Sequence, residues 1–139
     1  GPANFNASRQ IVVCSKALSQ QINCSLDSYS SFQLIANRIA MKDKLNQTNE
    51  SFWVIKKLKK RGFIAGKYGI CNESNLDINE LIKPKLFKHL PEIKKQYEAN
   101  YDILGDLKEL LNLSSRNYEN SIINKWQEVF PIYPMSAIN

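Results

Sequence analysis

Glycine, proline and histidine are scarce in this chain of 139 residues, which contains five glycines, five prolines and a single histidine, His89. The glycines form no phosphate-cradling loop, and one histidine cannot supply a Ser-His-Asp or Cys-His set. No apolar run approaches the length of a membrane-spanning helix. We therefore expect a non-catalytic protein with no cofactor, no small-molecule substrate and no membrane partner.

Cysteine is also rare, and the three cysteines, Cys14, Cys24 and Cys71, cannot all pair within the chain. Their spacing fits no zinc-binding pattern, so we expect no metal site. Buried or idle thiols are typical of a reducing compartment, which predicts a nuclear or cytoplasmic location.

Glycosylation sequons argue for a different location. The chain holds fifteen asparagines and fourteen serines and threonines, for which chance gives about one or two N-x-S/T sequons. Six are present, at Asn6, Asn23, Asn46, Asn49, Asn72 and Asn112. A secreted glycoprotein has this pattern, and so does a chain whose Asn and Ser cluster at helix caps and turns. Both interpretations stay open.

Charge is distributed unevenly along the chain. The net charge is +6, but residues 1–70 carry +8 and residues 71–139 carry −2. This asymmetry predicts that the first half contacts nucleic acid or an acidic protein partner. The composition, with 43% hydrophobic residues, predicts one compact unit with a real core. Gly1-Pro2 is typical of the remnant of a cleaved tag.

Apolar spacing predicts three helices in the first half, over residues 8–22, 28–45 and 50–61. The expected core residues of the first two are Ile11, Cys14, Leu18 and Ile22, and then Phe32, Ile35, Ala36 and Ile39. The third would bury Val54, Ile55 and Leu58.

A short β-hairpin is predicted to follow the third helix. Gly62 suits the end of a helix because it tolerates left-handed backbone angles. Residues 63–65 and 70–71 are β-prone, with Gly66–Gly69 as the turn between them. Phe63, Ile64 and Ile70 are its expected core residues.

This helix and hairpin resemble the recognition helix and wing of winged helix-turn-helix domains. The matching residues are Lys56, Leu58, Gly62, Phe63 and Ile64. The resemblance implies a mostly α (α+β) fold, with a winged-helix-like core of three helices and a hairpin over residues 3–83. It also implies a nucleic-acid-binding or scaffold domain of a genome-maintenance or transcription assembly. Many such domains instead dock other subunits of a replication or telomere-capping complex, which is the alternative function.

The second half is predicted to be a C-terminal helical extension over residues 84–139, packed on the first domain. A short helix over 74–82 precedes it, and helices over 92–104, 106–111 and 115–130 follow. Pro131 ends the last of these and starts an apolar tail.

Two sets of residues are candidate binding sites. On the predicted third helix and its wing, phosphate contacts are expected from Trp53, Lys56, Lys57, Lys60, Arg61 and Lys67. The alternative is that Trp53 belongs to the core and the lysines form a solvated rim. In the second half, a protein interface is expected from Tyr97, Tyr101, Trp126, Phe130 and Tyr133. These aromatic residues would otherwise be core.

Overall fold

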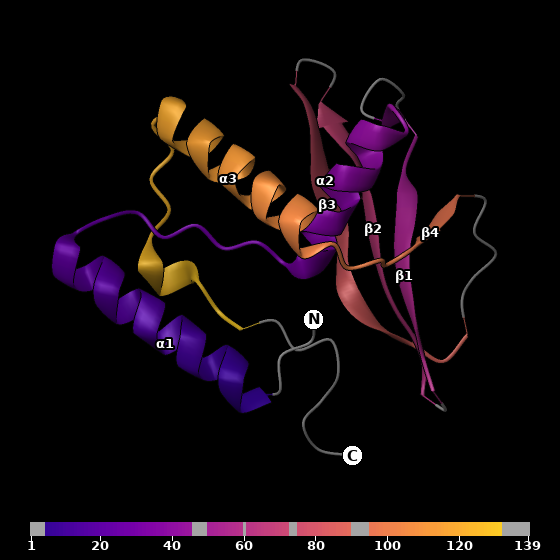
Figure 1. Ribbon diagram of the computed structural model, residues 1–139, viewed down its shortest axis with the longest axis horizontal. Coiled ribbons are helices and arrows are strands. Elements are labelled where there is room, and N and C mark those ends of the chain that lie inside the picture. Colours follow the sequence, from indigo (N-terminus) through magenta and orange to yellow (C-terminus); the bar gives the residue numbers. More distant parts are fainter. Residues whose placement is uncertain (1–4, 46–49, 60, 73–74, 90–94, 132–139) are drawn as a thin grey trace.

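The computed structural model describes residues 5–45, 50–59, 61–72, 75–89 and 95–131. Its centre is a four-stranded sheet with the strand order β3-β2-β1-β4, accompanied by three α-helices and a short 3-10 helix, η2 (Figure 1). The elements are α1 (Phe5–Ile22), α2 (Ser31–Lys42), β1 (Phe52–Leu58), β2 (Gly62–Asn72), β3 (Asn75–Phe87), β4 (Gln96–Glu98), α3 (Ile103–Glu119) and η2 (Trp126–Glu128).

The predicted third helix is wrong, because its residues form strand β1. Its apolar residues satisfy the spacing of a helix, but they equally suit a strand that is buried on both faces. Val54 and Ile55 point to opposite faces of the sheet, and both are buried. Aromatic and β-branched residues at 52–55 favour a strand over a helix.

The predicted pairing of residues 63–65 with residues 70–71 is wrong, because both segments lie in β2 and the hairpin is formed by β1 and β2. β1 pairs antiparallel with β2, and Gly66–Gly69, the predicted turn, lies inside β2. Gly62 does have the left-handed conformation that the sequence predicts, with φ of 92°, but it follows the turn between β1 and β2. Residues 75–82, predicted as a helix, belong to β3, which pairs antiparallel with β2.

The helices of the second half also differ from prediction. Residues 96–98 form β4, which lies parallel to β1, so the helix predicted over 92–104 is wrong. α3 runs without a break through residues 113–115, where the sequence predicts one. The helix predicted over 115–130 is likewise wrong, since α3 ends at Glu119 and η2 follows.

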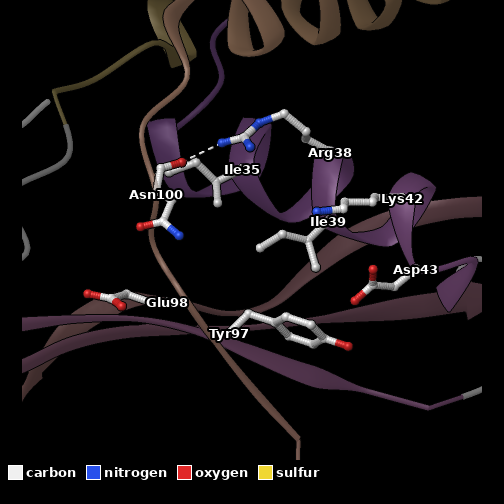
Figure 2. A pocket seen from close by; sticks show the side chains of 8 residues that line it. All are labelled: Ile35, Arg38, Ile39, Lys42, Asp43, Tyr97, Glu98 and Asn100. Carbon is white, nitrogen blue, oxygen red and sulfur yellow. Dashed lines mark hydrogen bonds between the residues drawn. The ribbon is translucent and has the colours of Figure 1, made fainter.

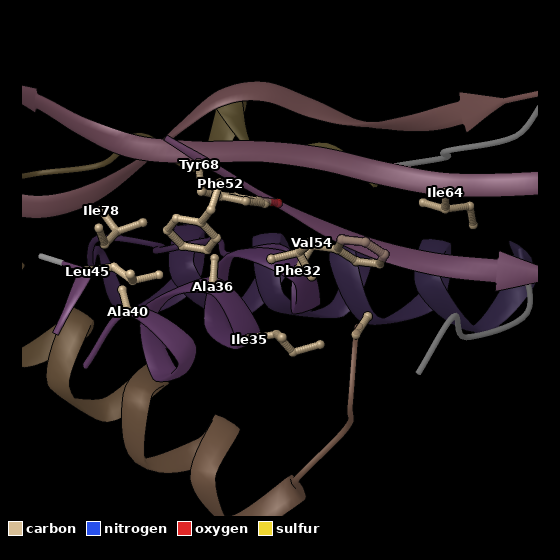
Figure 3. Close-up of a cluster of buried hydrophobic side chains, with 11 residues drawn as sticks. Phe32, Ile35, Ala36, Ala40, Leu45, Phe52, Val54, Ile64, Tyr68 and Ile78 are labelled. Carbon is tan, nitrogen blue, oxygen red and sulfur yellow. The ribbon is translucent and has the colours of Figure 1, made fainter. Parts of the chain in front are cut away.

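Helix α2 packs on one face of the sheet and forms the main core with it (Figure 3). The predicted inner residues Phe32, Ile35 and Ala36 are buried there, and Ile39 packs against them. From the strands, the core receives chiefly Phe52, Val54, Ile64 and Tyr68. We call this side of the sheet the core face.

A buried polar cluster joins the start of α2 to the strands. The Ser30 hydroxyl accepts a hydrogen bond from the Gln33 backbone N–H (3.0 Å) and caps the helix. Ser30 and Tyr68 both donate to Glu80 Oε2, each at 3.3 Å. Burial, and then the charge of Glu80, raises the pKa of the Tyr68 phenol, so the hydroxyl stays protonated and remains a donor.

Helix α3 packs on α2 through polar contacts. Arg38 Nε lies 3.1 Å from Asp106 Oδ1, and the Arg38 guanidinium also donates to the Asn100 carbonyl. At the other end of α3, Ser114 and Asn117 donate to the Asp27 carboxylate. These bonds attach the linker between α1 and α2 to α3.

Helix α1 lies apart from the sheet, and its contacts are with η2 (Figure 1). Lys16 Nζ lies 4.5 Å from the ring centroid of Phe130. The helix itself is correctly predicted, but its predicted core stripe is wrong because Ile11, Leu18 and Ile22 are exposed. The cysteines Cys14 and Cys24 are free but exposed rather than buried, and the side chain of Cys71 lies outside the described residues.

The fold class predicted from the sequence is therefore wrong. The chain is an α/β structure built on a mixed four-stranded sheet, and a mostly helical winged-helix domain does not describe it. The predicted domain boundary at residues 83 and 84 falls inside β3. Among the described helices, none is long and apolar enough to cross a membrane.

Gly62→Ala tests the turn between β1 and β2. An added Cβ would overlap the Phe87 carbonyl oxygen, and the φ of Gly62 is unfavourable for alanine. We expect the free energy of unfolding to fall by about 2 kcal/mol or more, measured by urea denaturation. Arg61→Ala, at the exposed neighbouring position, should change it by no more than about 0.5 kcal/mol. Equal stability of the two variants would contradict this turn geometry.

Arg38→Ala tests the attachment of α3 to α2. The ion pair with Asp106 is largely shielded from solvent, with side-chain exposures of 26% and 15%. Its loss should lower the free energy of unfolding by about 1 kcal/mol. Lys42→Ala, one helical turn further along α2 at an exposed position, is the matched control and should be neutral. A neutral Arg38→Ala would show that the ion pair does not hold α3 in place.

Candidate binding surface

The face of the sheet opposite the core face carries a group of lysines and aromatic rings. Cross-strand partners point to the same face, so the register determines which residues lie together. Trp53 pairs with Lys67, Lys57 with Phe63, Ala65 with Lys85, and Phe63 with Phe87. We call this surface the basic sheet face, and its members are Trp53, Ile55, Lys57, Phe63, Ala65, Lys67, Ile82, Lys85 and Phe87.

The centre of the basic sheet face is apolar. Trp53 and Phe87 meet edge to face, with ring centroids 5.8 Å apart. Ile55 and Ala65 are buried, while Trp53, Phe63 and Phe87 are half-buried. Because α2 is the described helix that packs on the sheet, and it lies on the core face, these large rings provide the cover for Ile55 and Ala65.

Lysines form the rim of this surface. Lys57 and Lys85 are exposed, and Lys67 is half-buried. Lys85 Nζ also lies 5.2 Å from the ring centroid of Phe87. Within the described strands, Glu98 is the one acidic residue in register with this face, at its β4 edge. The surface is thus strongly positive around an apolar centre.

The residues predicted to contact phosphates divide between the two faces. Trp53, Lys57 and Lys67 share the basic sheet face, and Arg61 lies exposed in the turn after β1. Lys56 points to the core face, where its Nζ lies 4.4 Å from the ring centroid of Tyr101. Lys60 lies outside the described residues.

The residues predicted as a protein interface do not form one surface. Tyr97 and Tyr101 are partly buried against the main core, and Tyr97 meets Phe52 edge to face at 5.6 Å. Trp126 and Phe130 lie on the other side of the molecule, around Lys16. Tyr133 lies outside the described residues. Their role in binding stays a prediction.

A cleft of about 200 Å³ separates α2 from β4 (Figure 2). Ile35 and Ile39 line its apolar side, and Tyr97 lies across from them. Burial, and then a hydrogen bond with Asp43, raises the pKa of Tyr97. The polar side chains of the cleft are Arg38, Lys42, Asp43, Glu98 and Asn100.

The charges of this cleft balance one another. Arg38 is engaged with Asp106 and with the Asn100 carbonyl, and the exposed Lys42 is accompanied by the neighbouring Asp43. No single charge dominates, and no set of donors converges on one point. We therefore regard the basic sheet face, rather than the cleft, as the better candidate for binding.

The acidic, thiol and imidazole side chains of the described residues are dispersed. Across the described ranges, no three His, Cys, Asp or Glu side chains gather as a metal site requires. His89, the chain's one histidine, is exposed just after β3.

Lys85 and Phe87 are the members of the basic sheet face that sequence reasoning missed. They lie in the segment Ile82–Phe87, where lysine at 83 and 85 alternates with Pro84 and Leu86. Period-two alternation is the signal of a strand with one exposed face. The short helix predicted over 74–82 concealed it.

Comparison with solved structures identifies the fold but not the function. One similar structure is described as an uncharacterized protein with similarity to peptidase YeaZ from Pseudomonas aeruginosa. It has a TM-score of 0.63 and 11% sequence identity, over 97% of this chain and 70% of that chain. Another similar structure is YeaZ from Pseudomonas aeruginosa, with a TM-score of 0.61 and 11% identity, over 96% of this chain and 70% of that chain.

No protein-family model matches the sequence, and none of the curated proteins matches it. At 11% identity, the structural likeness establishes a shared α/β fold alone. It also removes the basis of the winged-helix interpretation, together with the nucleic-acid-binding, docking and nuclear roles that the resemblance implied. This chain is similar in fold to these YeaZ structures, and the residues that the structure describes form no winged helix.

Proposed function

We propose that this chain is a non-catalytic protein-binding domain, whose basic sheet face docks an acidic, partly apolar segment of a partner protein. The observation that carries the proposal is the arrangement of the Trp53–Phe87 ring pair inside a rim of Lys57, Lys67 and Lys85. Protein interfaces have this anatomy, with aromatic residues in the centre and polar residues around them.

The side chains of this surface favour a protein over a nucleic acid as its partner. The cations assigned to it are lysines, which act as point charges and discriminate bases poorly. The half-buried rings are stacked edge to face on one another and are not arranged as free platforms for bases. A partner with alternating acidic and apolar side chains satisfies both the rim and the centre.

One structural neighbour is described as similar to a peptidase, so a bound peptide could also be a substrate. Among the described residues, no three His, Cys, Asp or Glu side chains gather as a metalloprotease site would require, and the proposal is binding without cleavage. Mass spectrometry of the peptide after incubation separates these two outcomes, because cleaved peptide would overturn the non-catalytic part of the proposal.

A charge-reversal experiment tests the surface directly. The probe is a synthetic peptide in which Glu alternates with Leu, and the readout is Trp53 fluorescence in a Trp126→Phe background, since the chain has two tryptophans. Combining Lys57→Glu, Lys67→Glu and Lys85→Glu should weaken peptide binding at least about tenfold, because the reversed rim repels the probe. Binding by the unchanged rim should also weaken as salt rises.

The matched control reverses three exposed lysines on the helical side, Lys42, Lys44 and Lys108. This variant has the same net charge as the first, so a difference in binding between the two reports where the charges lie and not the total charge. Equal loss of binding in both variants would contradict a specific surface. Tighter binding of a single-stranded oligonucleotide than of the peptide, abolished by the same three reversals, would replace the protein partner with a nucleic acid.

A further inference from the structure

The side chains of the basic sheet face donate hydrogen bonds but accept none. Its nine members are three lysines, one tryptophan and five residues without a polar side-chain atom. Lysine and tryptophan side chains are donors only. Among the described strands, side-chain acceptors in register with this face lie at its margins, on Gln96 and Glu98 of β4 and on Asn79, the partner of Gly69.

This donor-only chemistry limits the conformation of a segment that is buried on the face. A buried backbone N–H group needs an acceptor, and leaving it without one costs free energy. An extended segment on the face finds no such acceptor, because strands pair along sheet edges and a sheet face presents side chains. A helix needs none there, because its N–H groups bond to its own carbonyl groups. The face therefore favours a helical occupant.

The positive charge of the face is available to an occupant. The ion pairs of the described residues lie elsewhere, one between α2 and α3 and the other between residues just before β1 and β4. Lys57 and Lys85 are exposed, and the printed contact of Lys85 is with the ring of Phe87 rather than with an acid. Acidic side chains of the occupant would complement these ammonium groups.

The three lysines follow one another along the strands. Lys67 lies in the cross-strand row of Trp53, Lys85 lies in the next row on this face, and Lys57 lies in the row after that. Same-face rows are two residues apart, which is about 7 Å along a strand. Acids four residues apart on a helix are separated by about 6 Å along its axis. A helix that lies along the strands thus brings its acids close to successive lysines.

The lysines also stand on both sides of the apolar centre. Lys57 belongs to β1 and Lys85 to β3, and β2 lies between these strands with Ala65 in the middle. An apolar stripe of a helix above Ala65 would contact the rings of Trp53 and Phe87. Its acids would then be needed on both flanks of the stripe, to reach both outer lysines.

We propose that the partner segment is an amphipathic helix that lies along the strands of the basic sheet face, with acidic residues on both flanks of its apolar stripe. This inference rests on the proposed function and adds the conformation and the residue pattern of the partner. Val54 and Ile55 make β1 a strand that is buried on both faces, as is usual in sheets that are covered on both sides. The partner helix would form the layer opposite α2.

Three synthetic peptides test the conformation of the partner. The first two contain Glu and Leu in equal numbers. In the first, Leu recurs every three or four residues, and in the second, Leu and Glu alternate strictly. The third is the first peptide with one central residue replaced by proline, which breaks a helix. Binding is measured by Trp53 fluorescence in the Trp126→Phe background.

The first peptide should bind at least about tenfold more tightly than each of the other two, because it alone forms a stable helix with one apolar stripe. Circular dichroism of the mixture should show more helix than the sum of the separate components. Equal or tighter binding of the alternating or the proline peptide overturns the helical partner and leaves the proposed function standing. If none of the three peptides binds, the proposed function fails as well.

A second experiment tests the two acidic flanks. In two further versions of the first peptide, Glu is replaced by Gln on one flank or on the other. Lys57→Ala should weaken binding of one version about threefold or more and leave the other unchanged, and Lys85→Ala should do the reverse. Lys108→Ala, at an exposed position on α3, is the control and should change neither. Equal effects of Lys57→Ala and Lys85→Ala on both versions would overturn the proposed arrangement of the helix.

Discussion

The packing of α2 on the core face of the sheet is the contact on which the rest of the molecule depends. Phe32, Ile35 and Ala36 fill the space above Phe52 and Val54, and all five are essentially shielded from water. At about 25 cal/mol per Å² of apolar surface, this burial is the main favourable contribution to folding. The polar cluster of Ser30, Tyr68 and Glu80 then sets the position of α2 along the strands, because its buried hydroxyls need these partners.

Because α2 occupies one face of the sheet, the alternation of side chains along β1 places neighbouring lysines on opposite faces. Lys56 is drawn to the core face and covers Tyr101, while its neighbour Lys57 joins Trp53 and Lys67 on the other side. A helix over the same residues would have placed both lysines on one exposed surface. The pleat of β1 therefore determines the composition of the basic sheet face, and hence the kind of partner that we propose for it.

The basic sheet face and the helical layer differ in character because they belong to different layers of the fold. On the basic sheet face, aromatic rings cover the buried strand residues Ile55 and Ala65. Lysines at its edge keep the surface soluble. The helical layer instead attaches α3 to α2 and to the preceding linker through polar side chains such as Arg38 and Asp27, while large apolar side chains of α1 and α3 stay exposed.

Local sequence patterns were sufficient to predict α1, α2 with its buried face, and the left-handed backbone at Gly62. These features depend on neighbours within one or two turns of chain, which the sequence displays directly. Cys14 and Cys24 are free and exposed, and only the tertiary structure determines that exposure.

The strands, the sheet order and both candidate surfaces were decided by tertiary structure. The spacing of Val54 and Ile55 fits a helix and a doubly buried strand equally well, and the pairing of β1 with both β2 and β4 establishes the strand that residue type only favoured. The pairing of β4 with β1 joins residues some forty positions apart, for which short-range spacing carries no signal. The sequence by itself determined where apolar and basic side chains occur, and the long-range contacts decided which of them face water.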